Sequence, residues 1–339
     1  MENTPFTEAI CPAIQEALIN ITKDKTPSLK RTPTGYLDAV VSVENMAGVS
    51  KIPLDQGNGK IKAVKLTYIQ RGCEDDIASE CLSGCQTEIE KLPKEQIVEI
   101  TKCKTTKGIG FDELQMRRLC EKDSQFMKDV VNSEVDALVT SINADLIATQ
   151  AVNFGAFVPA QVPPYHANMI NDITGAPIYL GEKRVLEQFA NIGVSNKPLL
   201  IGAGKLDDYA LQQKLGCCND QGIDLSKAGN FSYYRDRRVG TILGDVDDFI
   251  GLAPGSVQLL TSNAFVGDYK KVNDFFVHDT FVDPKTGLRF DFLMVYDPCT
   301  FNYVIKFGLA YELWFMPSNS YAYCDEQYGV NGTLYFHAD

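Results

Sequence analysis

The segment that decides the fold is residues 111–149, FDELQMRRLCEKDSQFMKDVVNSEVDALVTSINADLIAT. Its second half carries one apolar stripe, with members three or four residues apart as on one face of a helix: Met127, Val131, Val135, Leu138, Ile142 and Leu146. The segment contains neither proline nor glycine. We therefore predict a helix that spans roughly 55 Å if it is unbroken, with a possible break near Asp123 and Ser124. Such a helix is a mechanical element on which other parts of the chain pack.

On the N-terminal side of this helix, the sequence predicts an arm and then strands. Residues 5–21 have the spacing of an amphipathic helix, and the polar stretch 22–34, with two prolines, is typical of an extended arm. Strand-forming residues predict three strands: 36–43, 60–69 and 97–104. Between the last two strands lies a polar, cysteine-containing insertion, 70–94, which predicts a protruding loop.

On the C-terminal side, the pattern changes from α/β to strand-rich. Residues 182–192 and 206–215 predict short helices on either side of a buried strand at 197–202. Four further strands and a last one after a turn follow: 257–260, 274–282, 288–296, 301–314 and 329–336. The turn Asp283-Pro284-Lys285-Thr286-Gly287 predicts a hairpin, because proline presets the turn and glycine supplies a positive φ. The fold class is therefore α+β.

The charge balance argues against a nucleic-acid-binding protein. The 339 residues carry a net charge of −12, and the densest basic cluster is short and interrupted by an acid: Arg235-Asp236-Arg237-Arg238. Binding to phosphates needs a basic face, so we expect this chain at most to enclose a polyanion and not to bind it. The start of the sequence lacks the pattern of a signal peptide, and no stretch of about 18 apolar residues predicts a membrane span. We expect assembly in a cytoplasm.

The sequence carries no convincing catalytic or cofactor motif. His166, His278 and His337 lie far apart in sequence without metal-ligand spacing, so we interpret them as ordinary surface or half-buried residues, the alternative being a ligand or a base. The run Gly202-Ala203-Gly204-Lys205 invites a phosphate-loop interpretation, but Leu199 and Leu206 stand where that motif needs glycine and Ser or Thr. We predict no catalytic residue, no cofactor and no metal.

Four cysteines form the most pointed feature of the sequence: Cys73, Cys81, Cys85 and Cys103. Only Cys81 and Cys85 have the spacing of a zinc site. The four thiols fit a zinc site, two disulfides formed after cell lysis, or free thiols, and the sequence leaves these alternatives open. A disulfide or zinc cross-link would stabilise the loop, because its sequence GCEDDIASECLSGCQ has few apolar residues to form a core.

The order of elements resembles the major capsid proteins of tailed bacteriophages, the Hong Kong 97 type of fold. Two local stretches also look like this family: residues 235–239 through Ala253–Leu260, and the hairpin DPKTGLRFD at 283–291, which is similar to capsid proteins of some Bacteroidetes phages. The resemblance covers most of the chain, although its motifs carry no chemistry. The acidic balance and the cysteine-bearing loop depart from the commonest examples.

The resemblance implies a division of the chain: an N-terminal arm, 1–34; strands with an extended loop, 35–105; a peripheral domain with the spine helix, 106–175; an axial domain, 176–257; and C-terminal strands that complete both domains, 258–339. It implies a structural protein of the virion and no enzyme. The implied partners are other copies of the chain in pentamers and hexamers, a portal, and scaffold or auxiliary capsid proteins. The shell would enclose DNA without sequence-specific binding, and no membrane is involved.

Two other classes of protein remain as alternatives. One is a different virion protein, either a tail component or a jelly-roll coat; the long helix argues against the jelly roll, which is nearly all strands. The other is a soluble hydrolase with a carboxylate pair, for which Asp245, Asp247 and Asp248 are examples of available acids. The sequence leaves open the triangulation number, the host and any dependence on scaffold or protease.

Overall fold

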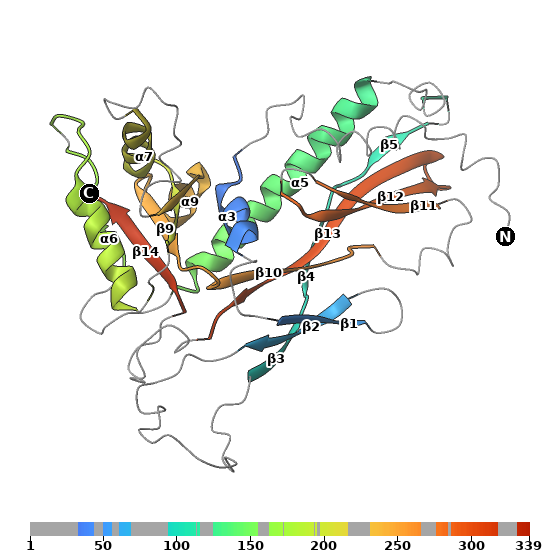
Figure 1. The fold of residues 1–339 in the computed structure, drawn as a ribbon. Coiled ribbons are helices and arrows are strands. Elements are labelled where there is room, and N and C mark those ends of the chain that lie inside the picture. Colours follow the sequence, from blue (N-terminus) through green and yellow to red (C-terminus); the bar gives the residue numbers. More distant parts are fainter. Residues whose placement is uncertain are drawn as a thin grey trace, which may run out of the picture.

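The computed structural model describes residues 33–43, 50–55, 61–68, 94–112, 114–115, 125–154, 163–171, 173–192, 194, 197–215, 231–265, 276–283, 286–317 and 331–339. These residues form three sheets and a set of helices, an α+β arrangement (Figure 1). The helix expected at 5–21, the arm up to residue 32 and the loop from 70 to 93 lie outside the described residues. The expected division into domains therefore stays a prediction.

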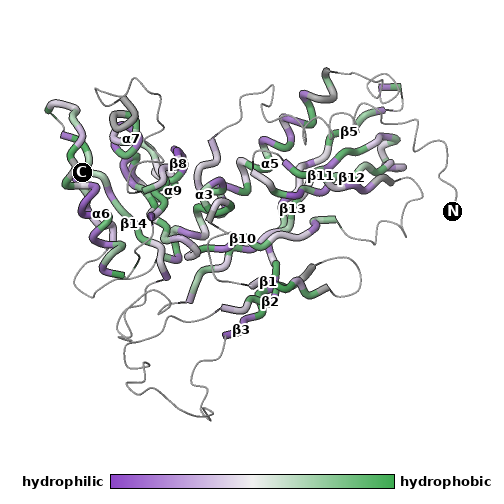
Figure 2. Tube along the Cα trace, viewed as in Figure 1, coloured by the Kyte–Doolittle hydropathy of each residue, from purple (hydrophilic) through white to green (hydrophobic). Residues whose placement is uncertain are grey.

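Helix α5, Gln125–Ala151, is the long helix of the fold. Its stripe is buried as predicted: Val131, Val135, Leu138, Ile142 and Leu146. The expected helical segment starts slightly later than residue 111: Phe111 belongs to strand β5, Ile109–Phe111, whereas Leu114 and Gln115 are helical. Ile109 and Phe111 alternate around Gly110, and this short strand pairs with the edge of a sheet instead of entering the helix. The 27 residues of α5 span about 40 Å. In Figure 2 hydrophobic and hydrophilic residues alternate along α5.

Helix α3, Gly35–Val43, replaces the strand predicted at 36–43. The valines favour a strand, but the buried residues have helical spacing: Tyr36, Leu37, Ala39 and Val40. Side chains from other elements also satisfy the first backbone N–H groups of the helix. Tyr36 N donates to Asp236 at 3.1 Å, and Leu37 N donates to Asn143 Oδ1 at 2.9 Å. Tertiary packing against α5 therefore overrides the local preference.

Sheet B packs on α5 and has the order β10-β13-β12-β11, with β4 and β5 also paired to β13. Its strands are β4 Lys102–Thr105, β5, β10 Val257–Ser262, β11 Phe276–Val282, β12 Arg289–Asp297 and β13 Asn302–Phe315. The predicted hairpin is confirmed: β11 and β12 are antiparallel, and Asp283 N donates to Leu288 O at 2.9 Å. Gly287 has the expected positive φ, 72°.

Sheet C has the order β6-β14-β9-β7-β8 and helices on both faces. Its strands are β6 Tyr165–Ala167, β7 Leu199–Gly202, β8 Ser232–Arg235, β9 Asp248–Leu252 and β14 Thr333–Ala338. On one face Leu200 and Phe336 pack with α6, Tyr179–Asn191, and α7, Lys205–Leu215. On the other, Ile201 and Ile250 pack with α3 and α9, Arg237–Leu243. The helix–strand–helix block predicted over 182–215 is confirmed.

Sheet A is antiparallel and has the order β1-β2-β3, with β1 Ser50–Asp55, β2 Ile61–Tyr68 and β3 Lys94–Glu99. The single strand predicted at 97–104 is wrong. The chain changes sheets at Ile100 and Thr101, so that β3 lies in sheet A and β4 in sheet B. Sheet A lies beside sheet B, on the side away from α5 (Figure 1).

Asp236 is a buried carboxylate that joins three helices. It caps α9 by accepting from Arg238 N at 3.0 Å, and its other oxygen accepts from Tyr36 N at 3.1 Å and Asn143 Nδ2 at 2.7 Å. These donors come from α9, α3 and α5. This buried carboxyl group is tolerated because Tyr36 N, Asn143 Nδ2 and Arg238 N donate hydrogen bonds to its oxygens.

We expect Asp236→Ala to destabilise the folded subunit by about 3–5 kcal/mol, because it leaves two buried donors and one partly buried donor without this acceptor. Urea unfolding of the wild type and the variant measures the difference. Asp208→Ala, an exposed acid of α7, is the matched control and should change the unfolding free energy by less than about 0.5 kcal/mol. Equal stability of Asp236→Ala and the control would contradict the assigned role of this carboxylate.

Candidate assembly surface

Sheet A forms the base of the loop that the sequence singled out. Strands β2 and β3 are antiparallel neighbours, and their last registered pair is Tyr68 with Lys94. The chain therefore leaves the sheet at Tyr68 and returns to it at the adjacent residue of the next strand, Lys94. This confirms that the segment from 69 to 93 starts and ends on strands.

The inner face of sheet A is fixed to the edge of sheet B. Val64, Leu66 and Tyr68 are buried against a second set of residues from β10 and the end of β13: Leu260, Trp314 and Met316. Trp314 Nε1 also donates to Gln96 Oε1 at 3.0 Å. Lys51, directly opposite Leu66, lies on this face too, and burial lowers the pKa of its ammonium group to about 8.

The outer face of sheet A carries two exposed isoleucines, one on each side of a lysine. Ile52 and Ile97 both lie directly opposite Lys65, one on each side of it. Their side chains are 49% and 62% exposed, whereas Lys65 pairs with Glu95 at 2.8 Å. Two exposed isoleucines on either side of Lys65, on a sheet whose other face is buried, are unfavourable for an isolated subunit and favourable for contact with another surface.

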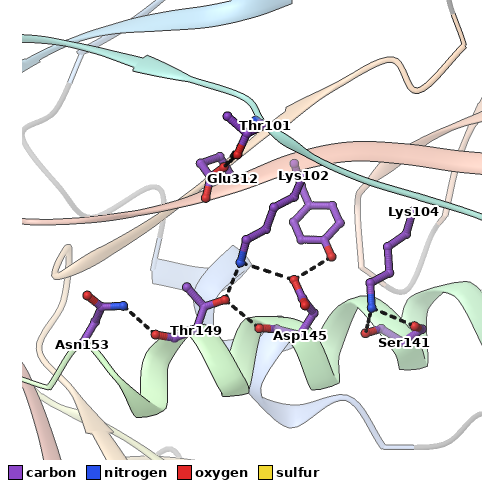
Figure 3. Close-up of polar contacts among 9 residues, drawn as sticks. Thr101, Lys102, Lys104, Ser141, Asp145, Thr149, Asn153 and Glu312 are labelled. Atoms are coloured by element: carbon purple, nitrogen blue, oxygen red, sulfur yellow. Dashed lines mark hydrogen bonds and ion pairs between the residues drawn. The ribbon is translucent and has the colours of Figure 1, made fainter.

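A polar brace holds the chain where it passes from sheet A to sheet B (Figure 3). Thr101 Oγ1 donates to Glu312 at 2.6 Å, at the point where β3 ends and β4 begins. Two residues of β4 then reach α5: Lys102 Nζ lies 2.6 Å from Thr149 Oγ1, and Lys104 Nζ lies 3.1 Å from Ser141 Oγ. Strand β4, which directly follows sheet A along the chain, is thus bound to the long helix as well as to β13.

Asp145 of α5 is the acceptor shared by two strands in this brace. Its Oδ2 lies 3.4 Å from Lys102 Nζ and 2.9 Å from the hydroxyl of Tyr311 on β13. Burial, and then the hydrogen bond to Asp145, raise the pKa of the Tyr311 hydroxyl above its ordinary value. Sequence analysis missed these residues because their partners are more than 40 positions apart. No local pattern indicates such pairs.

The structure brings together two of the three histidines. His166 and His337 lie opposite each other on β6 and β14, with ring centroids 5.5 Å apart. His166 Nδ1 is 2.7 Å from Asp339, and His337 Nδ1 is 2.9 Å from Asp248. His278 lies on β11, 3.5 Å from Asp291. Within the described part of the chain, no group of three or more His, Cys, Asp or Glu residues is arranged to hold a metal ion.

The run Gly202–Lys205 is a strand-to-helix turn between β7 and α7, as the sequence indicates. Asp247 Oδ1 accepts a hydrogen bond from Lys205 N at 2.8 Å, so a carboxylate of the chain lies at the helix end where a phosphate would bind. Gly204 has a positive φ of 58°, and a Cβ there would lie only 2.2 Å from that Asp247 oxygen. The turn therefore has an acidic partner of its own and does not favour an anion.

The cysteine cluster is described at one of its four positions. Cys103 is an exposed residue of β4, whereas Cys73, Cys81 and Cys85 lie outside the described residues. Zinc, disulfides and free thiols thus remain alternatives for this loop.

The described residues contain no helix that is long and apolar enough to cross a membrane.

Sequence patterns did not predict strand β1 or the exposed isoleucines Ile52 and Ile97 on sheet A. Pro53 weakens the strand pattern of SKIPLD, but the turn cluster Asp55-Gln56-Gly57-Asn58-Gly59 directly after it was recognisable. A strand before that turn and a strand after it is the pattern of a hairpin. This signal would have placed Ile52 opposite the 61–68 strand.

Comparison with known proteins gives structural likenesses only. No family model matches the chain, and no curated protein matches it. Solved structures that resemble it include the capsid asymmetric unit of cyanophage A-1(L), with a TM-score of 0.49 and 9% identity over 93% of this chain and 96% of that one. A virus-like particle from Pyrococcus furiosus has a TM-score of 0.45 and 8% identity over 98% and 100% of the two chains. A chain from Mycobacterium phage Che8 has a TM-score of 0.43 and 13% identity over 92% and 94%.

Proposed function

We propose that this chain is a major capsid protein of a tailed bacteriophage, which self-assembles into the icosahedral shell that encloses the phage genome. The observation that carries the proposal is sheet A. It presents the exposed pair Ile52 and Ile97 on its outer face, and its β2–β3 end is the base of a segment of about 25 residues. A segment of that length between strands is usually functional or bound to a partner.

The contacts that fix sheet A to the rest of the subunit support a role in assembly. A contact made by this sheet is transmitted to the rest of the subunit, because Trp314 and Glu312 join it to β13 and Lys102 joins β4 to α5. Such a subunit suits repeated contacts with identical copies, in which each interface is met by the same rigid surface. The proposed partners are therefore other copies of the chain in pentamers and hexamers, together with a portal and scaffold or auxiliary capsid proteins.

The net charge of −12 fits a container rather than a nucleic-acid-binding protein. Packaged DNA would be confined by the shell without sequence-specific contact. We propose that the protein is located in the virion after assembly in the host cytoplasm. Its hairpin DPKTGLRFD further supports the kind of capsid protein found in Bacteroidetes phages. Among the alternatives, a jelly-roll coat is disfavoured by α5, a 27-residue helix.

We expect the purified wild-type chain, alone or with a scaffold partner, to form rings or shells visible by electron microscopy. Ile97→Glu should abolish them while the subunit still folds, because Ile97 is exposed in the monomer and a carboxylate in an interface is costly to desolvate. Circular dichroism and thermal melting measure the fold, and light scattering measures the particles.

Ile97→Val is the matched control, since it keeps an apolar β-branched side chain, and it should assemble like the wild type. A wild-type protein that stays monomeric at every concentration would overturn the proposed function. Normal shells from Ile97→Glu would instead show that the outer face of sheet A is not an interface.

A further inference from the structure

A cavity of about 440 Å³ lies between strand β6 and helix α6, at the edge of sheet C. Cavities of about 300–1,000 Å³ are typical of small-molecule sites. Helix α6 is held beside the chain that follows β6 by a hydrogen bond from Ile178 N to Met169 O at 2.7 Å. In Figure 1, α6 and β14 lie at the end of the molecule that carries the C-terminus. The cavity thus belongs to a different sheet from the candidate assembly surface.

Part of the cavity lining is apolar. Tyr165 of β6, Val185 of α6 and Phe336 of β14 contribute to it, and all three belong to one hydrophobic cluster. The ring centroids of Tyr165 and Phe336 are 5.7 Å apart, and none of the three residues is more than 6% exposed. Because these side chains are fixed by the core, they offer a preformed apolar surface to a ligand.

One positive charge in the lining is left without a partner. Glu187 Oε1 lies 3.5 Å from Lys183 Nζ, and His166 Nδ1 lies 2.7 Å from Asp339 Oδ1. Arg184 also lines the cavity, but within the described part of the chain its exposed side chain forms no ion pair. A guanidinium group binds a carboxylate through two parallel hydrogen bonds. A single guanidinium balances the one charge of a carboxylate, but not the nearly double charge of a phosphate group.

Gln188 adds an unused acceptor to the same lining. Its Oε1 is buried and accepts no hydrogen bond from the described residues. A buried acceptor of this kind is unfavourable until a donor reaches it. Gln188 lies one turn after Arg184 on α6, so the two side chains are neighbours on one face of the helix. A ligand that carries an N–H group close to its carboxylate can therefore reach both.

We propose that the cavity between β6 and α6 binds the carboxylate of an N-acylated apolar amino acid. The carboxylate pairs with Arg184, the amide N–H donates to Gln188 Oε1, and the apolar side chain packs against Tyr165 and Phe336. Two sources have this chemistry: a free N-acyl amino acid, and the last residue of a peptide. The inference goes beyond the proposed function, because binding in this cavity does not depend on the assembly of a shell.

Isothermal titration calorimetry of the full-length chain with N-acetyl-L-phenylalanine tests the site. The wild type should bind this probe saturably. Arg184→Gln should weaken binding at least about tenfold, and so should replacement of the probe by its uncharged amide, because each removes one half of a charge-assisted pair. Lys183→Gln removes a charge from the same helical turn outside the lining and should bind like the wild type. Thermal melting checks that these variants, both at exposed positions, still fold.

A second comparison isolates the hydrogen bond to Gln188. Gln188→Leu should weaken binding of N-acetyl-L-phenylalanine about fivefold, because the amide N–H of the probe loses its acceptor. Hydrocinnamate has the same ring and a carboxylate but no N–H group, so its binding should be unchanged or stronger in Gln188→Leu. Equal losses for both probes would contradict the assigned contact.

The peptide Gly-Gly-Phe distinguishes the two sources of the ligand. Binding as tight as that of N-acetyl-L-phenylalanine identifies the carboxyl end of a polypeptide as the ligand, whereas binding of the small probe alone identifies a free acid. The proposal is overturned if the wild type shows no saturable binding at millimolar probe, or if Arg184→Gln binds as the wild type does. Neither result affects the proposed function, which is tested by the formation of particles.

Discussion

Val135→Asp abolishes folding of the subunit, or leaves it so unstable that no assembly follows. Val135 is fully buried and belongs to the apolar cluster that also contains residues of α3, sheet B and sheet C. An unpaired carboxylate there costs several kcal/mol, which approaches the whole stability of an ordinary domain. Loss of the cooperative melting transition, with the protein recovered in the insoluble fraction, is the measurement.

Ala137→Asp is the control for Val135→Asp. It introduces the same side chain two residues away on an exposed position of α5, so it should fold and melt within a few degrees of the wild type. Leu138→Asp, which is also on the buried face, should behave like Val135→Asp. A soluble, cooperatively melting Val135→Asp protein would mean that the stripe on α5 is not the centre of the core.

The stripe on α5 could be predicted from sequence because its signal is local and repeated. Five buried residues at helical spacing outweigh any single exception. The strand predicted at 36–43 failed for the opposite reason. Its valines favour a strand, but Asp236 and Asn143, about 200 and 106 positions away, supply the acceptors that begin a helix there. Such partners have no signature near residues 36–43.

The candidate assembly surface was predictable only in outline. The strands around the 70–94 segment were recognised, because β2 has a strand pattern and the insertion is polar. The sequence predicts a single strand over 97–104, although the chain changes sheets at Ile100 and Thr101. No turn residue marks this change, because hydrogen bonds from Thr101 to Glu312 of another strand hold the chain there.

Deletion of residues 74–92, with a short Gly-Ser bridge, leaves a folded subunit that forms no shell. The fold survives because Tyr68 and Lys94 are already adjacent partners on β2 and β3, so a short turn can close the hairpin. The inner face of sheet A also keeps its contacts with Leu260 and Trp314. Circular dichroism and thermal melting should match the wild type, while electron microscopy shows no particles.

Shell loss is expected because the deleted segment has an excess of acidic residues, in a chain that is itself acidic. Residues 70–94 carry more acids than bases: Glu74, Asp75, Asp76, Glu80, Glu88 and Glu90 against Arg71, Lys91 and Lys94. The whole chain is acidic too, with a net charge of −12. A basic patch on a neighbouring copy, or a staple through the loop cysteines, is the partner that such a segment needs.

A replacement of the same length separates reach from chemistry. If residues 74–92 are exchanged for an equally long Gly-Ser segment, the chain keeps its reach but loses its charges and cysteines, and shells should again be absent. Shells from this replacement but not from the deletion would assign the loop a spacer role. Shells from the deletion itself would show that the loop is a surface ornament, and that sheet A and the other described surfaces are sufficient for assembly.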